Sequence, residues 1–150
     1  MTRVLLAGVS TRGFAESAAR AGYEVVAVDG FGDLDLVACA TEVRVVRARG
    51  RFSARAAATA ARDVSCEAVV YGASFENHPG AVRALAANRL LWGNPPAVLT
   101  RARDPRHLAR VVGDAGLSGP RVRLTRPAPG TRSGWLVKPL RSGEIGRAHV

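Results

Sequence analysis

The chain has 150 residues and carries 22 basic side chains against 12 acidic ones, which gives a formal net charge of +10 at pH 7. Hydrophobic residues make up 47% of the sequence, which is enough for a core and excludes an intrinsically disordered chain. No apolar run approaches the roughly 20 residues that cross a bilayer, and the layout of a signal peptide is missing, so we expect a cytoplasmic protein without membrane contact. Cys39 and Cys66 are isolated, which excludes a disulfide framework and a zinc knuckle.

The positive charge alone does not predict nucleic-acid binding. Of the 22 basic residues 21 are arginine and one is Lys138, and alanine is abundant, as a GC-rich coding sequence produces. The arginines occur along the whole chain, and the eight aromatic residues are not interleaved with them as base-stacking platforms would be. We therefore expect no nucleic-acid partner, while a polyphosphate such as ATP remains compatible with the charge.

Short β-branched runs alternate with alanine-rich segments over residues 1 to 94, which predicts a parallel sheet covered by helices. Gly22 suits the left-handed position after the first helix, and Ser53 suits an N-cap before the second. Right-handed crossovers then give an α/β, Rossmann-like parallel sheet with helices on both faces. The expected strands are Val4–Ala7, Glu24–Val28, Val43–Val46, Ala68–Tyr71 and Leu90–Trp92, and the expected helices are Gly13–Ala21, Ala54–Arg62 and Gly80–Asn88.

The pattern changes after Asn94-Pro95-Pro96. Asp104-Pro105 predicts a capped helix that runs to about Ala115, with Val111 and Val112 able to face a core. A stretch rich in Pro, Gly and Arg follows over residues 118–134 and encloses one expected edge strand, 122–124. A second strand is expected directly after it, over 135–139.

The first loop that could bind a ligand follows the first strand and has the spacing G-x-S-x-x-G from Gly8 to Gly13. Asp29 ends the second strand, where a dinucleotide fold places the acid that binds ribose. Ser10 replaces the middle glycine, however, and its side chain hinders the close approach of a pyrophosphate. Two interpretations remain open: an NAD site built from Gly8, Gly13 and Asp29, and a tight turn without a cofactor.

The second loop, residues 72–79, follows the fourth strand and would share the carboxyl rim of the sheet with the first. Glu76 and Asn77 are candidates to orient a substrate amine or carboxylate. Asn77 with Pro79 is equally a helix start, and this capping role is the favoured one. His78 has no second histidine nearby, so no metal site is expected in this chain.

The third candidate is W-L-V-K-P over residues 135–139, with a Ser142-Gly143 turn after it. Lys138 is the one lysine in a chain that otherwise uses arginine. An ammonium at a strand end before a glycine-bearing turn suits a nucleotide phosphate, although an isolated surface lysine is the competing interpretation.

In this order the motifs resemble the amino-terminal part of an ATP-grasp ligase. The resemblance is carried by residues 4–35, by Y-G-A-S-F-E-N-H-P at 71–79, by L-L-W-G-N-P-P-A-V-L at 90–99 and by W-L-V-K-P. It implies a Rossmann-like pre-ATP-grasp domain over 1–94, linker helices over 95–117, and the truncated start of an α+β nucleotide-binding subdomain over 118–143.

Enzymes of this family use ATP and magnesium to activate a carboxylate as an acyl phosphate, which an amine or thiol then attacks. The resemblance therefore implies ATP and a small-molecule carboxylate as partners, with the magnesium ligands outside this chain and no catalytic residue assignable within it. It places ATP phosphate at Lys138, Ser142 and Gly143. It places the substrate cleft at Gly8, Ser10, Thr11, Arg12, Asp29, Ser74, Phe75, Glu76 and Asn77.

The family pattern stops at Gly143. The string E-I-G-R-A-H-V over 144–150 equals the translation of a common sequencing adaptor, so we expect it to be non-native and the gene to continue. The chain itself is then expected to be inactive, with residues 118–150 poorly ordered. The alternatives are a stand-alone Rossmann oxidoreductase or nucleotide-binding domain and a noncatalytic regulatory or nucleic-acid-binding domain.

Overall fold

The computed structural model describes residues 1–125 and 134–140. Its centre is a parallel sheet of five strands in the order β3-β2-β1-β4-β5. The register pairs Leu5 of β1 with Val26 of β2 and with Val69 of β4. The strands are β1 Arg3–Ala7, β2 Glu24–Asp29, β3 Glu42–Val45, β4 Ala68–Tyr71 and β5 Leu90–Leu91. The sheet and its interleaved helices confirm the predicted α/β fold class.

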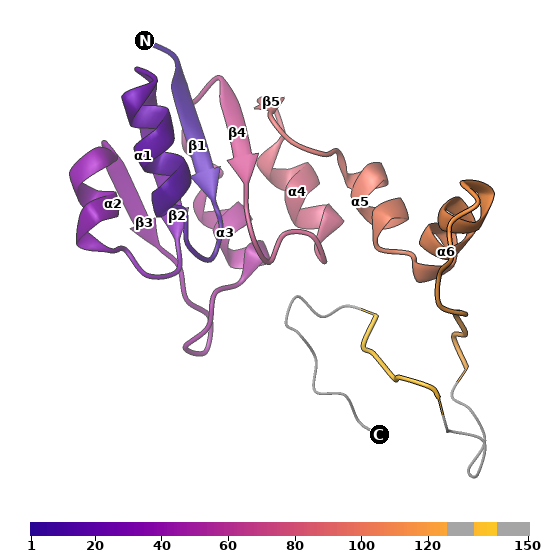
Figure 1. The fold of residues 1–150 in the computed structure, drawn as a ribbon. Helices are drawn as coiled ribbons and strands as arrows, with labels where there is room; N and C mark the ends of the chain where they lie inside the picture. Colours follow the sequence, from indigo (N-terminus) through magenta and orange to yellow (C-terminus); the bar gives the residue numbers. More distant parts are fainter. Residues whose placement is uncertain (126–133, 141–150) are drawn as a thin grey trace.

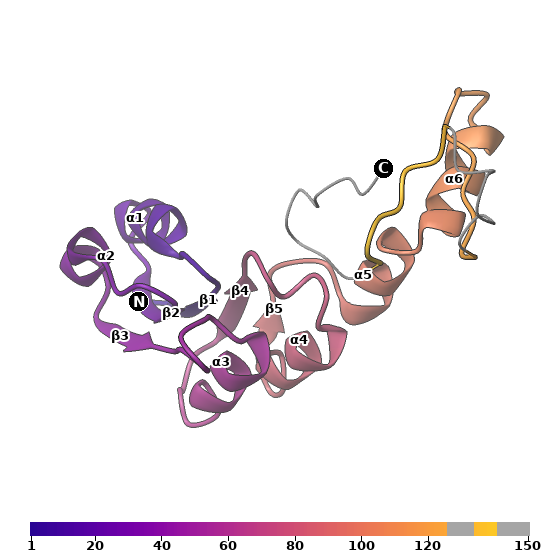
Figure 2. The ribbon, with the colours of Figure 1, turned by 90° about the horizontal axis from the view of Figure 1, so that it is seen from below.

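The two faces of the sheet are covered by different pairs of helices (Figures 1 and 2). Alternation along β1 sends Leu5 and Ala7 to one face and Val4 and Leu6 to the other. The helices α1 Arg12–Arg20 and α2 Leu34–Cys39 pack on the Val4 face, and α3 Ala54–Ala60 and α4 Pro79–Leu85 pack on the Leu5 face. Small alanines on α3, such as Ala57, let this helix approach the strands closely.

The capping signals in the sequence are present at the predicted places. Gly22 has a φ of 83° after α1, and the Ser53 hydroxyl accepts a hydrogen bond from the Ala56 amide at 3.3 Å. Asp104 caps the helix that starts at Pro105 by accepting from the Arg106 amide at 2.9 Å. The short helix α2 was not predicted.

Two further helices leave the sheet on the β5 side, α5 Pro96–Ala102 and α6 Pro105–Asp114 (Figure 2). Leu99 of α5 joins the core cluster on the Leu5 face. The expectation that Val111 and Val112 face a core is wrong, because α6 has no buried residue and Val111 is 48% exposed.

The strands predicted over 122–124 and 135–139 do not form as strands among the described residues. A strand needs a neighbour along its length to pair its backbone groups, and in these two segments only Val137 takes part in a β-bridge. Instead, Trp135 lies under the guanidinium groups of Arg121 and Arg123, whose carbons are 5.5 and 5.0 Å from the ring centre. No helix in the described part of the chain is long and apolar enough to span a membrane.

Candidate functional site

Asp29 ties together two loops at the carboxyl edge of the sheet. One carboxylate oxygen accepts from the Thr11 amide at 2.6 Å and from the Thr11 hydroxyl at 2.9 Å. The other accepts from the amides of Phe31 and Gly32 at 2.6 and 2.9 Å. Asp29 and Thr11 are both 1% exposed, so the aspartate fixes the shape of the loops rather than presenting a free carboxylate.

The remaining members of the first loop are more accessible. Ser10 and Arg12 are exposed at the rim, and Gly8 is buried. The Arg12 guanidinium lies 3.5 Å from the Asp35 carboxylate and 4.0 Å from that of Glu16. A substrate at this rim would therefore meet the side chains of Ser10 and Arg12, with Thr11 and Asp29 behind them.

The first and second loops lie side by side, as the strand order requires. A Cβ added to Gly8 would be 3.4 Å from the Cα of Gly72, which begins the loop after β4. A Cβ at Gly8 would therefore be in ordinary van der Waals contact with the backbone of the other loop. The two loops predicted to share a rim do so.

Within the second loop, Phe75 has a structural position. Its ring is completely buried, with its centre 6.1 Å from that of Phe52 and 6.0 Å from that of Tyr71. The Tyr71 hydroxyl donates to the Asn94 carbonyl at 2.6 Å, and burial raises the pKa of this phenol. Ser74 adopts a φ of 77° and is half-buried, so this loop turns sharply around its anchored aromatic ring.

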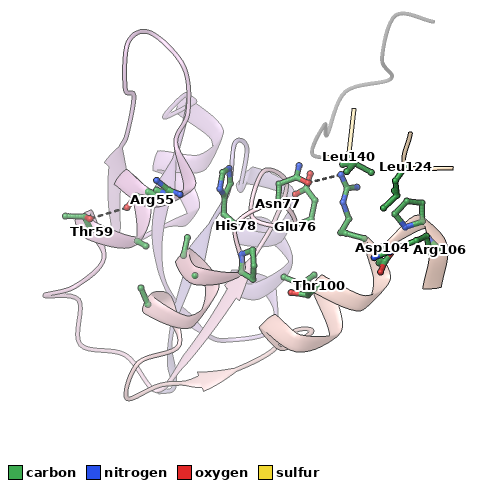
Figure 3. A pocket seen from close by; sticks show the side chains of 18 of the residues that line it. Arg55, Thr59, Glu76, Asn77, His78, Thr100, Asp104, Arg106, Leu124 and Leu140 are labelled. Atoms are coloured by element: carbon green, nitrogen blue, oxygen red, sulfur yellow. Dashed lines mark hydrogen bonds and ion pairs between the residues drawn. The ribbon is translucent and has the colours of Figure 1, made fainter. Parts of the chain in front are cut away.

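A groove of about 790 Å³ runs beside this loop, between α3, α4 and the segment that joins α5 to α6 (Figure 3). Glu76, Asn77 and His78 line its middle. Arg55 and Thr59 lie at one end, and Asp104, Arg106 and Leu124 lie at the other. Leu140 also contributes to the lining, so the segment that carries Lys138 reaches this groove.

The Asn77 side chain does not cap α4. His78 occupies the cap position without a side-chain hydrogen bond, and the Asn77 side-chain oxygen Oδ1 accepts from the Arg103 guanidinium at 2.8 Å. The favoured capping role of Asn77 is therefore wrong: Asn77 stands one position before the N-cap, and its side-chain oxygen accepts from Arg103 in the linker. This contact connects the second loop to the segment between α5 and α6.

The structure also shows a basic element that sequence reasoning missed. Between Glu42 and Asp63 there is no acidic residue, while six arginines occur, at positions 44, 47, 49, 51, 55 and 62. Part of this run, residues 46–52, forms a tight hairpin loop that follows β3 at the carboxyl edge. The long interval without acidic residues was the available signal, and treating arginine as codon bias concealed it.

The predicted phosphate site is described only in part. Lys138 is exposed, whereas Ser142, Gly143 and the tail over 144–150 lie outside the described residues. Across residues 1–125 and 134–140, no three His, Cys, Asp or Glu side chains are grouped as metal ligands would be.

The sequence matches no protein-family profile and no curated protein. Solved structures do match. The biotin carboxylase domain of a single-chain bacterial carboxylase aligns with a TM-score of 0.64 and 23% identity, over 88% of this chain and 32% of the other. An N5-carboxyaminoimidazole synthetase from Staphylococcus aureus, complexed with ADP, aligns with a TM-score of 0.56 and 19% identity, over 77% of this chain and 30% of the other.

The N5-carboxyaminoimidazole ribonucleotide synthetase from Thermotoga maritima gives a TM-score of 0.55 and 16% identity, over 93% of this chain and 34% of the other. The chain thus spans about a third of the length of these structures. The match is to the amino-terminal part of ATP-grasp enzymes, and the fold is that of their pre-ATP-grasp domain.

Proposed function

We propose that this chain is the substrate-side portion of an ATP-dependent ligase that joins a carboxylate to an amine or a thiol. The observation that carries the proposal is the fold, which the chain shares with the amino-terminal part of ATP-grasp enzymes. The groove beside the loop after β4 supports it, because ligands of open α/β sheets bind outside the carboxyl ends of the strands.

The proposed reaction has two steps. The substrate carboxylate attacks the terminal phosphorus of ATP, which forms an acyl phosphate and releases ADP. The amine or thiol then attacks the acyl carbon, and inorganic phosphate leaves. Both steps depend on neutralising negative charge and on positioning the reactants.

The proposed roles follow the geometry of the carboxyl edge. Ser10 and Arg12 are the accessible substrate-side groups of the first loop, and Glu76 and Asn77 line the groove beside the second loop, in whose lining the first loop takes no part. Gly8, Thr11, Asp29, Ser74 and Phe75 shape these two loops from behind. Lys138 is exposed and has the charge for an ATP phosphate, with Ser142 and Gly143 in the following turn.

The proposed domain division is 1–94 for the pre-ATP-grasp domain, 95–117 for the linker helices, and 118–143 for the start of the nucleotide-binding subdomain. Residues 144–150 are assigned to translated adaptor. We place the magnesium ligands in a continuation of the native gene beyond Gly143, and the 150-residue chain is then inactive.

The test compares the 150-residue chain with the product of the uninterrupted gene. Release of ADP and phosphate is measured with a panel of carboxylates and amines in the presence of magnesium and ATP. The complete product is expected to release both in a manner that depends on the two substrates, and the short chain is expected to release neither. Turnover by the short chain, or a complete product that does not bind ATP, would contradict the proposal.

The second candidate is a Rossmann oxidoreductase that binds NAD through Gly8, Gly13 and Asp29. The structure disfavours it, because all four hydrogen bonds to the Asp29 carboxylate come from the chain itself. Titration with NADH followed by fluorescence separates the two candidates. Saturable binding that Asp29→Ala abolishes, in a variant that keeps its circular dichroism spectrum, would favour the oxidoreductase.

A further inference from the structure

The hairpin after β3 holds arginines in a fixed arrangement. The Ala48 amide donates to the Arg51 carbonyl at 2.7 Å, and the Arg51 amide donates to the Ala48 carbonyl at 3.2 Å. The two residues between them have positive φ angles, 52° at Arg49 and 76° at Gly50. This is the two-residue turn that normally selects Asn-Gly, so an arginine at its first position is unusual.

The base of the hairpin is tied to the loop after β2. The Val46 amide donates to the Asp29 carbonyl at 2.8 Å, and the Arg47 Nε donates to the Gly30 carbonyl at 2.8 Å. A Cβ added to Gly30 would be 2.8 Å from the Val9 carbonyl oxygen and 3.4 Å from the Phe52 ring. The hairpin therefore stands on a closely packed support, and Figure 1 shows it projecting from the sheet between β3 and α3.

The six arginines of this run have different surroundings: Arg47 donates to the Gly30 carbonyl at the hairpin base, and Arg62 is exposed in the lining of the groove. Arg44 is structural, since it donates to the Asp63 carboxylate, the Glu42 carboxylate and the Ala60 carbonyl. Arg49, Arg51 and Arg55 are exposed, and no ion pair of the described residues involves them. We call these three residues the arginine arm.

The arm belongs to the rim of the candidate site. The hairpin follows the carboxyl end of β3, and Arg55 lines the groove from the first turn of α3. Figure 3 shows Arg55 at the groove end opposite Asp104 and Arg106. The acidic side chains of the lining, Glu76 and Asp104, belong to the middle and the far end, so the Arg55 end is the one that favours an anion.

We propose that the arginine arm binds a phosphate monoester group of the small-molecule substrate. One carboxylate presents two oxygens, which a single guanidinium fork satisfies, whereas a phosphate monoester carries up to two charges and three acceptor oxygens. Three exposed guanidinium groups, two on the hairpin and one at the groove end, supply more charge and more donors than one carboxylate uses, which favours the second group. The substrate of the proposed ligase is therefore a phosphorylated compound. The assignment of this phosphate to a substrate rests on the proposed function, whereas phosphate binding by the arm does not.

Binding of inorganic phosphate to the 150-residue chain, measured by calorimetry at low salt, tests the arm. The test variant is Arg49→Gln/Arg51→Gln/Arg55→Gln. The matched control is Arg20→Gln/Arg83→Gln/Arg101→Gln, which removes the same charge from exposed positions outside the groove. We expect saturable binding that weakens about tenfold or more in the test variant and less than about twofold in the control.

Equal weakening in the two triple variants would overturn the proposal, because net charge alone would then account for binding. Stronger binding of succinate than of phosphate at equal ionic strength would also overturn it, as would retention of duplex DNA without saturable phosphate binding. A single change, Arg49→Asn, guards against a folding artefact, since asparagine suits this turn. It is expected to lower phosphate affinity while the urea midpoint does not fall.

The outcome for the arm and the outcome for the ligase are separable. If phosphate binds at the arm but the complete gene product consumes no ATP, the arm stands and the proposed function fails. If the complete product is a ligase whose KM for its substrate is unchanged by Arg49→Gln/Arg51→Gln/Arg55→Gln, the arm is wrong and the ligase stands.

Discussion

At the scale of single residues, Asp29 shows how a functional motif and a structural one look alike in sequence. An acid at the end of the second strand suggests a ribose contact, yet this carboxylate receives four hydrogen bonds from Thr11, Phe31 and Gly32. The sequence could not reveal this, because the donors are mostly backbone amides, whose direction depends on the turn after β2. What the sequence did predict is the place of Asp29 at the carboxyl edge beside the first loop.

The change Asp29→Asn should destabilise the fold strongly. The carboxamide nitrogen of asparagine is a donor, so it would face N–H or O–H donors at one of the two present oxygen positions. We expect the free energy of unfolding to fall by about 2–4 kcal/mol, because buried donors lose a charged acceptor. Urea denaturation measures this, with the exposed Asp35→Asn as the control at under about 0.5 kcal/mol. Equal effects of the two changes would show that Asp29 does not hold the loops.

Arg49 should carry a measurable backbone strain. Its φ of 52° is unfavourable for a residue with a long side chain, whereas asparagine adopts it readily. We expect Arg49→Asn to raise the free energy of unfolding by about 0.5–1 kcal/mol. Arg51→Asn is the matched change at a hairpin position without positive φ, and it should not stabilise. A loss of stability in Arg49→Asn would contradict a strained turn.

At the scale of elements, the strands and the helices with strong caps could be predicted, and the short or unsupported ones could not. All five strands were located: β1, β2 and β4 are apolar runs with buried residues, as parallel strands are, and the edge strands β3 and β5 carry shorter β-branched or leucine runs. The helix α2 spans only Leu34–Cys39, buries a single residue, Leu36, and has no side-chain cap. The sequence therefore contains no periodic pattern that predicts this helix. The two expected strands after residue 118 failed because strand formation depends on a partner, which local sequence does not contain.

Arg89 joins the carboxyl ends of two helices on the same face of the sheet. Its guanidinium donates to the carbonyls of Ala61 and Val64 after α3, at 2.7 and 2.6 Å, and to that of Leu85 at the end of α4, at 2.9 Å. Carbonyls at the end of a helix lack the amide partners of the helix interior, although the Ala61 carbonyl also accepts from the Val64 amide at 3.2 Å, and a cation there interacts favourably with the helix dipoles. We expect Arg89→Ala to lower the free energy of unfolding by about 2–3 kcal/mol.

The control for Arg89 is Arg83→Ala on α4, since Arg83 is exposed and its side chain makes no hydrogen bond to another described residue. We expect this change to lower the free energy of unfolding by no more than about 0.5 kcal/mol. Arg89→Lys should restore only part of the lost stability, because one ammonium cannot match the spread of a guanidinium over three carbonyls. Full rescue by lysine would mean that charge rather than geometry matters at this position.

The contact between Arg44 of β3 and Asp63 after α3 should make this part of the fold sensitive to acid. The hydrogen bond from Arg44 holds the pKa of Asp63 below its usual value of 3.8. A carboxyl whose pKa is lowered by folding stabilises the native state above its unfolded pKa, and this contribution disappears as the pH falls through the native pKa. The stability difference between the protein and Asp63→Asn should therefore be present at neutral pH and be lost in acid, as the pH falls through the lowered native pKa of Asp63.

Urea titrations over this pH range measure the difference directly. The contribution should be small, since the Asp63 side chain is 74% exposed and solvent screens the pair. A difference that grows as the pH falls would contradict the assigned direction of the pKa shift.

At the scale of the whole molecule, the net charge of +10 is distributed unevenly, and the region between Glu42 and Asp63 supplies six positive charges without an acidic one. The total charge indicated only that a polyanion was compatible with the surface. Folding places five of these six arginines in the lining of a groove or on the hairpin beside it, while Arg44 is used for structure. Composition does not separate these roles, since each depends on which element carries the residue.

This distribution predicts that phosphate stabilises the protein more than chloride does at equal ionic strength. Salt of any kind should raise the melting temperature, because it shortens the screening length from about 30 Å at 0.01 M to about 10 Å at 0.1 M and so weakens the mutual repulsion of the arginines. A ligand that binds the native state adds to this effect according to its concentration and affinity. The excess stabilisation by phosphate over chloride should disappear in Arg49→Gln/Arg51→Gln/Arg55→Gln and persist in Arg20→Gln/Arg83→Gln/Arg101→Gln. Thermal unfolding followed by circular dichroism measures both the screening effect and the binding effect. Identical unfolding curves in phosphate and in chloride would show that screening alone operates.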